Sequence, residues 1–323
     1  MRSVLRAAGS HWGTARRVAV GAVITTLLVG GCGLGSGQFG AAAFVGGTEI
    51  RQDQVHSQLV TVLDRESPQT RVELKGAHQL DDVSRKIVTA RIRHQLVVIA
   101  AQRERLTADQ DRVNRLVNEV GGAEAASKGT IYDANGYRQR AADTLLLSAL
   151  GRDTLRGSAV TIDYTTADNR AAAQQRVAEL AKAGSKGARQ MIDADVQAGK
   201  DAEVGKRIVA ADDPIFATTP AFGVAEGSVV AFQLEDTKPW VVMVVKNRTN
   251  RGVQPSDHAP PIDQIDPAIL EAVGVRQLVS IAQQVGVRLN PRYGVWDLVT
   301  LQAVPDGTQA GGFIASLRAA PRT

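Results

Sequence analysis

Apolar periodicity between residues 79 and 104 constrains the fold more than any other feature of this chain. The apolar side chains form two adjoining stripes, Val88-Ile92-Leu96-Ile99 and Val83-Ile87-Ala90. Because spacings of three and four residues bring side chains onto one face of an α-helix, the segment is predicted to be a single long helix. Since the apolar face is two stripes wide, this helix is expected to pack against more than one neighbour.

Helical signals continue on both sides of this segment, from residue 50 to residue 151. Further helices are predicted at about 52–64, 109–120 and 137–150. Thr107 to Gln110 has the spacing of a capping box, and Gly121-Gly122 is a typical stop signal. The N-terminal half is therefore predicted to be helical, preceded only by a short extended piece at 45–50.

The pattern changes near residue 158, where β-branched residues begin. The predicted elements are a strand at 159–164, a helix ending at Gly184, a helix at 188–197, a short strand at 206–210 and strands at 228–234 and 240–246. Glu235 to Pro239 separates the last two strands and is typical of a hairpin turn. These elements predict a small α+β unit.

A last helix is predicted after a polar, Pro-rich linker at 250–264. Asp266-Pro267 combines a capping residue with proline at the first helical position, which is typical of a helix start. Residues 299–323 contain much Gly, Ala and Arg and are predicted to be poorly ordered.

The positive charge of the chain is concentrated at its N-terminus. The sequence holds 38 Lys and Arg against 33 Asp and Glu, a net charge of +5. Four arginines and no acidic residue lie in residues 1–31, so the remainder carries a net charge of only +1. Because a phosphate-binding face needs a basic stripe, nucleic acid is not an expected partner.

Residues 18–31 form an uncharged apolar run that ends at Cys32. The run is shorter than the roughly 20 residues of a membrane-spanning helix and is typical of the apolar core of a secretory signal peptide. The sequence Val29-Gly30-Gly31-Cys32 resembles the lipobox of bacterial lipoproteins. The resemblance implies removal of residues 1–31, attachment of a diacylglyceryl group and palmitate-type acylation at Cys32, and a cell-membrane anchor on the extracytoplasmic face.

Two alternatives remain open for this N-terminus: an uncleaved anchor with a chance cysteine, and export by the twin-arginine route, to which Arg16-Arg17 points. The residues after that pair do not extend the match, so the general secretory route is favoured. Cys32 is the only cysteine, which excludes an intramolecular disulfide and a multi-cysteine metal site.

Three stretches of the chain are similar to parts of the SurA/PrsA class of extracytoplasmic chaperones. VGGTEI at 45–50 is similar to the entry of the SurA N-terminal domain, residues 214–246 are similar to the end of a parvulin domain, and NPRYGVWD at 290–297 is similar to a closing segment of actinobacterial members. The resemblance implies a mainly α fold with an α+β part. A helical SurA-N-like module would be completed by a C-terminal helix and carry a small parvulin-like domain.

The expected organisation follows from these patterns and the resemblance. It comprises a signal peptide (1–31), a flexible tether (32–43), a helical SurA-N-like domain (44–155), a degenerate parvulin-like domain (156–249), a linker (250–264), a C-terminal helix with its closing segment (265–298) and a poorly ordered tail (299–323).

The parvulin-like unit lacks the histidines that active parvulins place on their first and last strands. Val241 stands where the family has its second histidine, and no catalytic residue is expected. What the resemblance retains is an apolar floor. A peptide-binding set is therefore hypothesised from Phe216, Phe222, Trp240 and Met243. The same four residues are also typical of the core of a small sheet domain, and that interpretation is favoured.

Other chemistry-bearing residues are given structural interpretations. His94 is expected to be a packing or surface residue of its helix, and Arg85, Lys86, Arg91 and Arg93 are expected to form a solvated helix face. Close carboxylate pairs have no histidine nearby, so no metal site is expected, and no nucleotide or other cofactor motif is present.

The resemblance implies a membrane-anchored chaperone or holdase that binds unfolded or partly folded exported polypeptides, with little or no prolyl isomerase activity. The alternatives are an active peptidyl-prolyl cis-trans isomerase and a non-catalytic envelope scaffold lipoprotein. A solute-binding lipoprotein is disfavoured, because such proteins have two α/β lobes whereas residues 50–151 are predicted to be helical.

Overall fold

The computed structural model describes residues 40–76, 79–235 and 237–319. All of the described residues belong to one compact unit. The predicted signal peptide and the predicted lipidation site Cys32 lie outside the described residues. Among the helices of the described part, none is long and apolar enough to cross a membrane.

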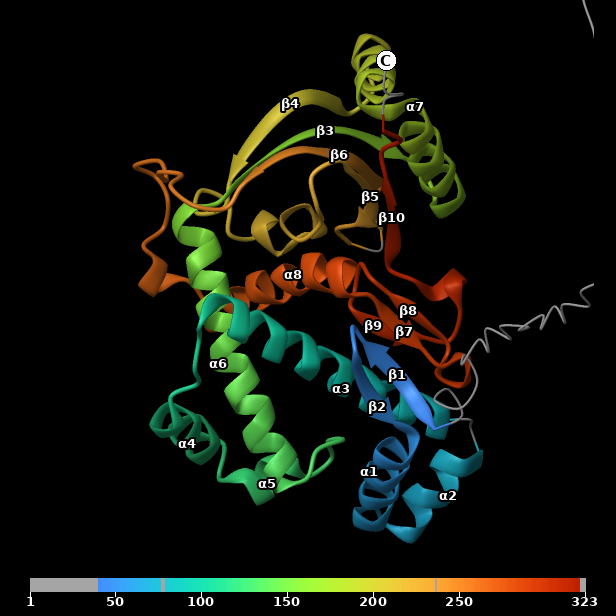
Figure 1. Cartoon of the computed structure of the whole chain (residues 1–323), viewed down its shortest axis with the longest axis vertical. Coiled ribbons are helices and arrows are strands. Elements are labelled where there is room, and N and C mark those ends of the chain that lie inside the picture. Colours follow the sequence, from blue (N-terminus) through green and yellow to red (C-terminus); the bar gives the residue numbers. More distant parts are fainter. Residues whose placement is uncertain (1–39, 77–78, 236, 320–323) are drawn as a thin grey trace, which may run out of the picture. The chain divides into compact units, whose positions relative to one another are not determined.

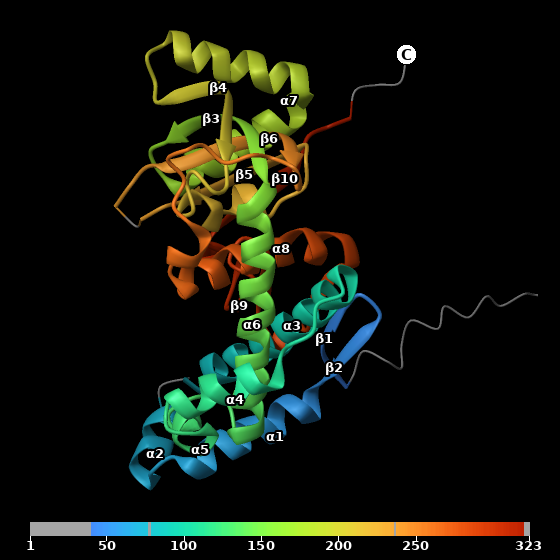
Figure 2. The ribbon, with the colours of Figure 1, turned by 90° about the vertical axis from the view of Figure 1, so that its left-hand side faces the viewer.

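Helices from both halves of the chain pack together into one helical layer (Figure 2). They are α1 (Gln52–Arg65), α2 (Pro68–Gly76), α3 (Gln79–Glu104), α4 (Gln110–Glu119), α5 (Ala123–Ser127), α6 (Ala134–Gly157) and α8 (Pro267–Val285). The side chains of Asp109, Asp133 and Asp266 accept backbone N–H groups at the starts of α4, α6 and α8. These bonds satisfy donors that a first helical turn leaves unpaired.

Helix α3 is central to this layer and begins and ends where the apolar periodicity predicted. Val88, Ile92 and Leu96 are fully buried, and α3 contacts α1, α6 and α8. The expectation of more than one packing partner is thus confirmed. Helix α8 packs against both α3 and α6, so the predicted C-terminal helix does complete the helical layer.

A small sheet joins the start of the described chain to the end of α8. Its strands lie in the order β2-β1-β7 and comprise β1 (Ala41–Val45), β2 (Thr48–Arg51) and β7 (Val287–Leu289). Strand β1 pairs antiparallel with both neighbours. The Asn290 side chain and backbone N–H groups donate to the carbonyls of Ala41 and Ala42. The motif at 290–297 therefore begins beside the start of β1, whose end opens the motif at 45–50. The flexible tether expected over 32–43 is wrong for residues 41–43, which lie in β1.

The α+β unit is a five-stranded antiparallel sheet in the order β10-β5-β6-β3-β4. Its strands are β3 (Ala159–Ala167), β4 (Ala202–Val209), β5 (Ser228–Gln233), β6 (Trp240–Thr249) and β10 (Gly312–Ser316). Figure 1 shows α7 (Arg170–Gln197) on one side of the sheet and α8 on the other. At Gly184, where two helices were predicted to separate, α7 is kinked by a φ of 68°.

The expectation of a poorly ordered tail over 299–323 is wrong for residues up to 316. Strand β9 (Gln302–Val304) pairs with β8 (Val295–Asp297), and β10 pairs with β5 along all five of its residues. Strands β9 and β10 are too short, at three and five residues, to show an alternating pattern in the sequence. Their order comes from pairing with strands far away in the sequence, which local composition does not report.

The two domains predicted at 44–155 and 156–249 share a hydrophobic core. Two short 3-10 helices, η1 (Phe216–Thr218) and η2 (Pro220–Phe222), lie between the sheet and α8 (Figure 1). One continuous cluster of buried residues runs from α3 through α8 and η2 into the sheet. A second, smaller cluster fills the space between the sheet and α7.

Candidate functional site

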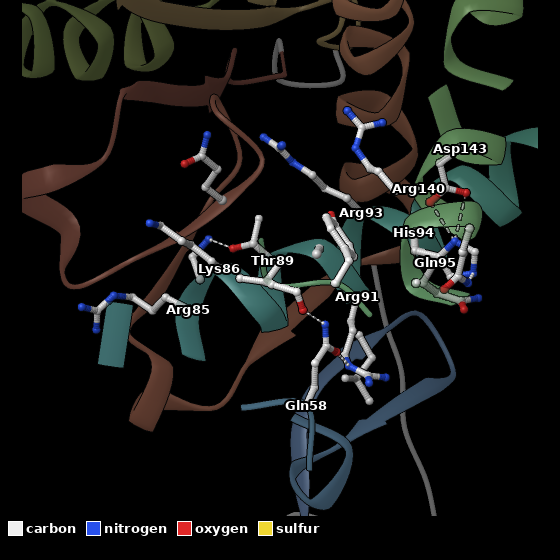
Figure 3. A pocket seen from close by; sticks show the side chains of 18 of the residues that line it. Gln58, Arg85, Lys86, Thr89, Arg91, Arg93, His94, Gln95, Arg140 and Asp143 are labelled. Atoms are coloured by element: carbon white, nitrogen blue, oxygen red, sulfur yellow. Dashed lines mark hydrogen bonds and ion pairs between the residues drawn. The ribbon is translucent and has the colours of Figure 1, made fainter. Parts of the chain in front are cut away.

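A groove of about 1170 Å³ lies in the helical layer, along α3. Its walls come from α1, α6, α8, strand β2 and the segment that contains β9. Pockets for drug-sized ligands commonly occupy about 300–1,000 Å³, so this groove is large enough for a segment of another chain. Figure 3 shows that its labelled side chains come from α1, α3 and α6.

The groove is lined by both apolar and polar side chains. Its apolar lining residues are Ile50, Ala90, Val97, Ile131, Leu147, Val275, Leu278, Ala303, Val304 and Pro305. Polar lining side chains include Gln54, Ser57, Gln58, Thr61, Gln95, Gln139 and Gln302. Such a mixed lining suits an extended polypeptide, because its apolar side chains can pack on the apolar residues while its backbone groups bond to amides and hydroxyls.

His94 is held between two side chains of α6. Its Nδ1 lies 2.9 Å from Asp143 Oδ2, and its Nε2 lies 2.6 Å from Gln139 Nε2 (Figure 3). A neutral imidazole that carries its proton on Nδ1 satisfies both contacts, because it donates to the carboxylate and accepts from the amide. The contacts join α3 to α6, so the structure assigns His94 the packing role that was expected from the sequence.

Arg91 joins α3 to α1 on another side of the groove. Its Nε donates to Gln58 Oε1 at 3.0 Å, and its Nη2 donates to the Gln54 carbonyl at 3.3 Å. Gln58 in turn donates to the Ile131 carbonyl at 2.8 Å. Burial lowers the pKa of Arg91. The expected solvated face is therefore wrong at this position, since Arg91 is half-buried and fixes a groove wall.

Arg93 holds the C-terminal segment in place. Its Nε donates to the Leu301 carbonyl at 2.9 Å and its Nη2 to the Thr300 carbonyl at 2.8 Å. Arg276 of α8 donates to the Val299 carbonyl at 2.7 Å. Burial lowers the pKa of Arg276 to about 10. The expectation that Arg93 belongs to a solvated helix face is therefore wrong as well. Arg93 and Arg276 come from different helices and bind the same turn of backbone.

The turn that they bind is itself strained. Leu301 is fully buried and has a φ of 54°, a left-handed conformation that side chains other than glycine seldom adopt. Asp297 stabilises the turn by accepting from the backbone N–H groups of Val299 and Gly311, at 2.9 and 2.7 Å. Strain of this kind persists only where surrounding contacts fix it. The turn precedes β9 directly and so positions that wall of the groove.

Arg140 of α6 lies in the groove near Arg93 (Figure 3). Its Nη2 donates to Glu271 Oε1 of α8 at 2.6 Å. Tyr132 also lines the groove, and its electrostatic neighbours include Arg140, Asp143 and Arg93. Burial raises the pKa of Tyr132. This end of the groove thus gathers two guanidinium groups and a phenol beside α8.

The hypothesised peptide-binding residues lie elsewhere and do not form one surface. Phe222 and Met243 are fully buried, and Phe222 meets Phe216 edge-on with ring centroids 6.4 Å apart. Trp240 lies on the opposite face of the sheet, against Phe313 and α7. None of the four lines the groove. The structure places three of them in hydrophobic cores, as the favoured interpretation expected; their binding role stays a hypothesis.

The groove residues were missed because the sequence shows them as ordinary helix-surface residues. Arg93 and His94 lie beside the apolar stripes of α3, at positions that would face solvent on an isolated helix. Their partners lie on α6 and on the C-terminal segment, 49 and more than 200 residues away. The only available signal was the charge density of one helix face, which is equally typical of a solvated surface.

Within the described residues, no group of three or more His, Cys, Asp or Glu side chains is placed to hold a metal ion. The polar part of the groove includes the pairs Arg140–Glu271, Arg85–Asp82 and His94–Asp143, together with several amides. These groups can donate to and accept from a bound polypeptide.

The chain was compared with protein families, curated proteins and solved structures. No protein-family model matches the sequence, and a search of curated proteins found no match. Among solved structures, the chain is similar to the crystal structure of the foldase protein PrsA from Lactococcus lactis, with 10% identity and a TM-score of 0.28, over 81% of this chain and 97% of that one. So low a TM-score carries no argument about fold or function.

Proposed function

We propose that this chain is a lipid-anchored extracytoplasmic chaperone that holds unfolded or partly folded exported polypeptides in the groove of its helical layer. The groove itself carries the proposal, because its size and mixed lining suit a segment of extended chain and require neither a nucleotide nor a metal. The proposal also rests on the sequence resemblance to the SurA/PrsA class and on the packing of α8 against α3 and α6.

The groove replaces the apolar floor of the α+β unit as the place where we propose that clients bind. The expected floor is occupied by the chain's own residues, since η1 and η2 lie between the sheet and α8. Phe222 has no exposed surface there. The α+β unit then acts as support for α8, and thereby for the groove, rather than as the site of client binding.

The membrane anchor belongs to the proposal as well. The sequence before residue 40 resembles a lipoprotein signal, and Cys32 would carry the lipid. Replacing Cys32 with serine in the full chain is expected to move the protein from the membrane fraction to the soluble extracytoplasmic fraction. Retention of the C32S variant in the membrane fraction would show that another segment anchors the chain.

Suppression of client aggregation tests the chaperone proposal directly. Residues 40–319 are mixed with a chemically denatured client, and light scattering is followed after dilution. We expect lower scattering with the wild-type protein and a loss of this effect in Ser57→Trp, which places an indole in the groove. Ser185→Trp is the matched control, because Ser185 is also an exposed helical serine but lies on α7, outside the groove.

If both tryptophan variants protect the client equally well, the client binds outside the groove. If a several-fold excess of the wild-type protein does not lower the light scattering, the holdase proposal is refuted. A proline-peptide isomerisation assay on the same preparation separates the enzymatic alternative. We expect rates equal to those without protein. A crosslinking experiment that recovered one stoichiometric envelope protein would instead favour the scaffold alternative.

A further inference from the structure

Three donors at one end of the groove are not engaged by any described residue. Arg93 donates through Nε and Nη2 but not through Nη1, and Arg140 donates through both Nη atoms but not through Nε. The Tyr132 hydroxyl likewise makes no hydrogen bond with the described residues, and none of these atoms is buried without a partner. All three side chains line the groove, so these donors remain available to a ligand.

The same place holds a cation that lacks a counter-ion. Arg140 is paired with Glu271 at 2.6 Å, and Asp143 is paired with His94 at 2.9 Å. Arg93 has no carboxylate within 4.0 Å among the described residues, and its bonded partners are neutral carbonyls. Burial lowers the pKa of Arg93, and the nearby Arg140 lowers it further. An anion that accepts a hydrogen bond from the remaining donor of Arg93 would stabilise this partly buried charge.

Glu271 of α8 is the acidic residue that acts electrostatically on Arg93, and it is already paired with Arg140. Lys86 lies seven residues before Arg93, two turns away on the same face of α3, and also lines the groove without an ion pair among the described residues. Among the described residues, the acidic side chains of the groove without an ion pair are Glu49, on β2, and Asp133, whose carboxylate accepts from the backbone N–H of Gly136 at the start of α6. The anion must therefore come from the ligand.

From this geometry we propose that Arg93, Arg140 and Tyr132 form a subsite for a carboxylate of the bound polypeptide, an inference that rests on the proposed function. A guanidinium group presents planar N–H donors that match the two oxygens of a carboxylate. The source is either the C-terminal carboxylate of a client segment or the side chain of an acidic residue within it. Clients that carry such a group next to apolar residues are then held more tightly than uncharged ones.

Isothermal titration calorimetry with three forms of one short apolar peptide tests the subsite. The first form has a free C-terminal carboxylate, the second a C-terminal amide and one internal glutamate, and the third a C-terminal amide and no acidic residue. We expect the third form to bind measurably and at least one acidic form to bind about tenfold more tightly, the gain expected from charge-assisted hydrogen bonds. Whichever acidic form gains identifies the source of the carboxylate.

A pair of charge-neutral double variants locates the effect. R140Q/E271Q removes the pair at the subsite and leaves the net charge unchanged. R152Q/D263N removes an arginine–carboxylate pair of α6 that lies outside the groove, with the same change in charge, and serves as the control. We expect R140Q/E271Q to lower the affinity of the acidic peptide about tenfold and to leave the uncharged peptide unaffected, whereas R152Q/D263N changes neither. Thermal unfolding of both variants reports whether they fold.

The outcomes separate the two proposals. Equal affinity of acidic and uncharged peptides for the wild-type protein overturns the carboxylate subsite and leaves the chaperone proposal standing. An equal loss of both peptides in R140Q/E271Q also overturns it, because the pair then supports only the groove wall. Absence of binding for all three peptides overturns the subsite together with peptide binding in the groove. If R140Q/E271Q fails to fold, Tyr132→Phe is used, and an unchanged preference for the acidic peptide in that variant counts against the phenol as part of the subsite.

Discussion

Gly151 of α6 and Gly274 of α8 face each other where these two helices cross. A Cβ atom on Gly151 would lie 2.0 Å from the carbonyl oxygen of Leu270, and one on Gly274 would lie 1.9 Å from that of Leu147. Both contacts are with backbone, which cannot move aside without shifting a helix. The two glycines therefore let a helix from the C-terminal half approach the N-terminal helices at backbone distance, close to the groove residues Leu147 and Glu271.

Replacing Gly274 with alanine is expected to destabilise the protein. The added methyl group must displace α8 from α6, and overpacking of this kind costs about 1–3 kcal/mol. Denaturant unfolding measures the effect, and Gly47→Ala is the control, because a Cβ there meets nothing within 4 Å. If both variants lose the same stability, the close crossing of α6 and α8 is not the cause.

A single hydroxyl attaches strand β9 to the central helix. Thr89 Oγ1 of α3 accepts from the Ala303 backbone N–H at 2.9 Å, and Thr89 is buried. Thr89→Val keeps the shape and leaves this N–H unpaired, which is expected to cost about 1–3 kcal/mol. Hydrogen exchange at Ala303 should accelerate accordingly. Thr61→Val is the control, since the exposed Thr61 hydroxyl bonds only within its own helix, and it should leave Ala303 unchanged.

The C-terminal strand is expected to be essential to the α+β unit. Truncation after Pro305 removes β10, including the Phe313 ring that packs on Trp240 at a centroid distance of 5.7 Å, and exposes the edge of β5. We expect the Tm to fall by about 5 °C or more. Truncation after Ala319 retains β10 and should leave the Tm unchanged. Equal Tm values for the two truncations would show that β10 contributes nothing to stability.

The buried carboxylate of Asp195 should make stability depend on pH. Burial raises its pKa, but hydrogen bonds from Lys200 and Thr165, together with the charge of Arg176, outweigh burial, so the pKa lies below its ordinary value of 3.8. A carboxyl group with a lowered pKa in the folded state stabilises the protein above the unfolded pKa and loses this contribution as the pH falls through the folded pKa.

Asp195→Asn is therefore expected to cost more stability at pH 7 than below pH 3.8. Denaturant unfolding of wild type and variant at both pH values measures the difference. Asp193→Asn is the control on the same helix, since its ion pair with Arg189 is half exposed and 3.9 Å long, and such pairs contribute little. A cost of Asp195→Asn that did not change with pH would show that its hydrogen bonds, not its charge, stabilise the fold.

Local sequence patterns predicted most of the helices and strands. The bounds of α3 and the start of α8 at Asp266-Pro267 follow from periodicity and capping, which depend only on neighbouring residues. The break at Gly184 was also visible, because glycine adopts a positive φ without a steric cost. The pairing of β10 with β5 was not visible in the sequence, since the five residues of β10 carry no pattern of their own.

The candidate site could not be predicted for the same physical reason. Arg93, which lacks an obvious partner in the sequence, bonds to carbonyls at Thr300 and Leu301, more than 200 residues away. Phe222 and Met243 were correctly recognised as large apolar residues of a sheet domain. Whether such residues line a pocket or fill a core depends on what covers them, and that is decided by α8 and by η2.

The sequence by itself determined where most of the longer helices begin and end, because hydrophobic period, caps and breakers act over a few residues. The tertiary structure alone decided that α8 returns to α3 and α6, that a tail strand closes the sheet, and that charged residues of α3 surround a groove. These outcomes depend on contacts between residues far apart in the chain, and such contacts gain their energy only when the whole core assembles.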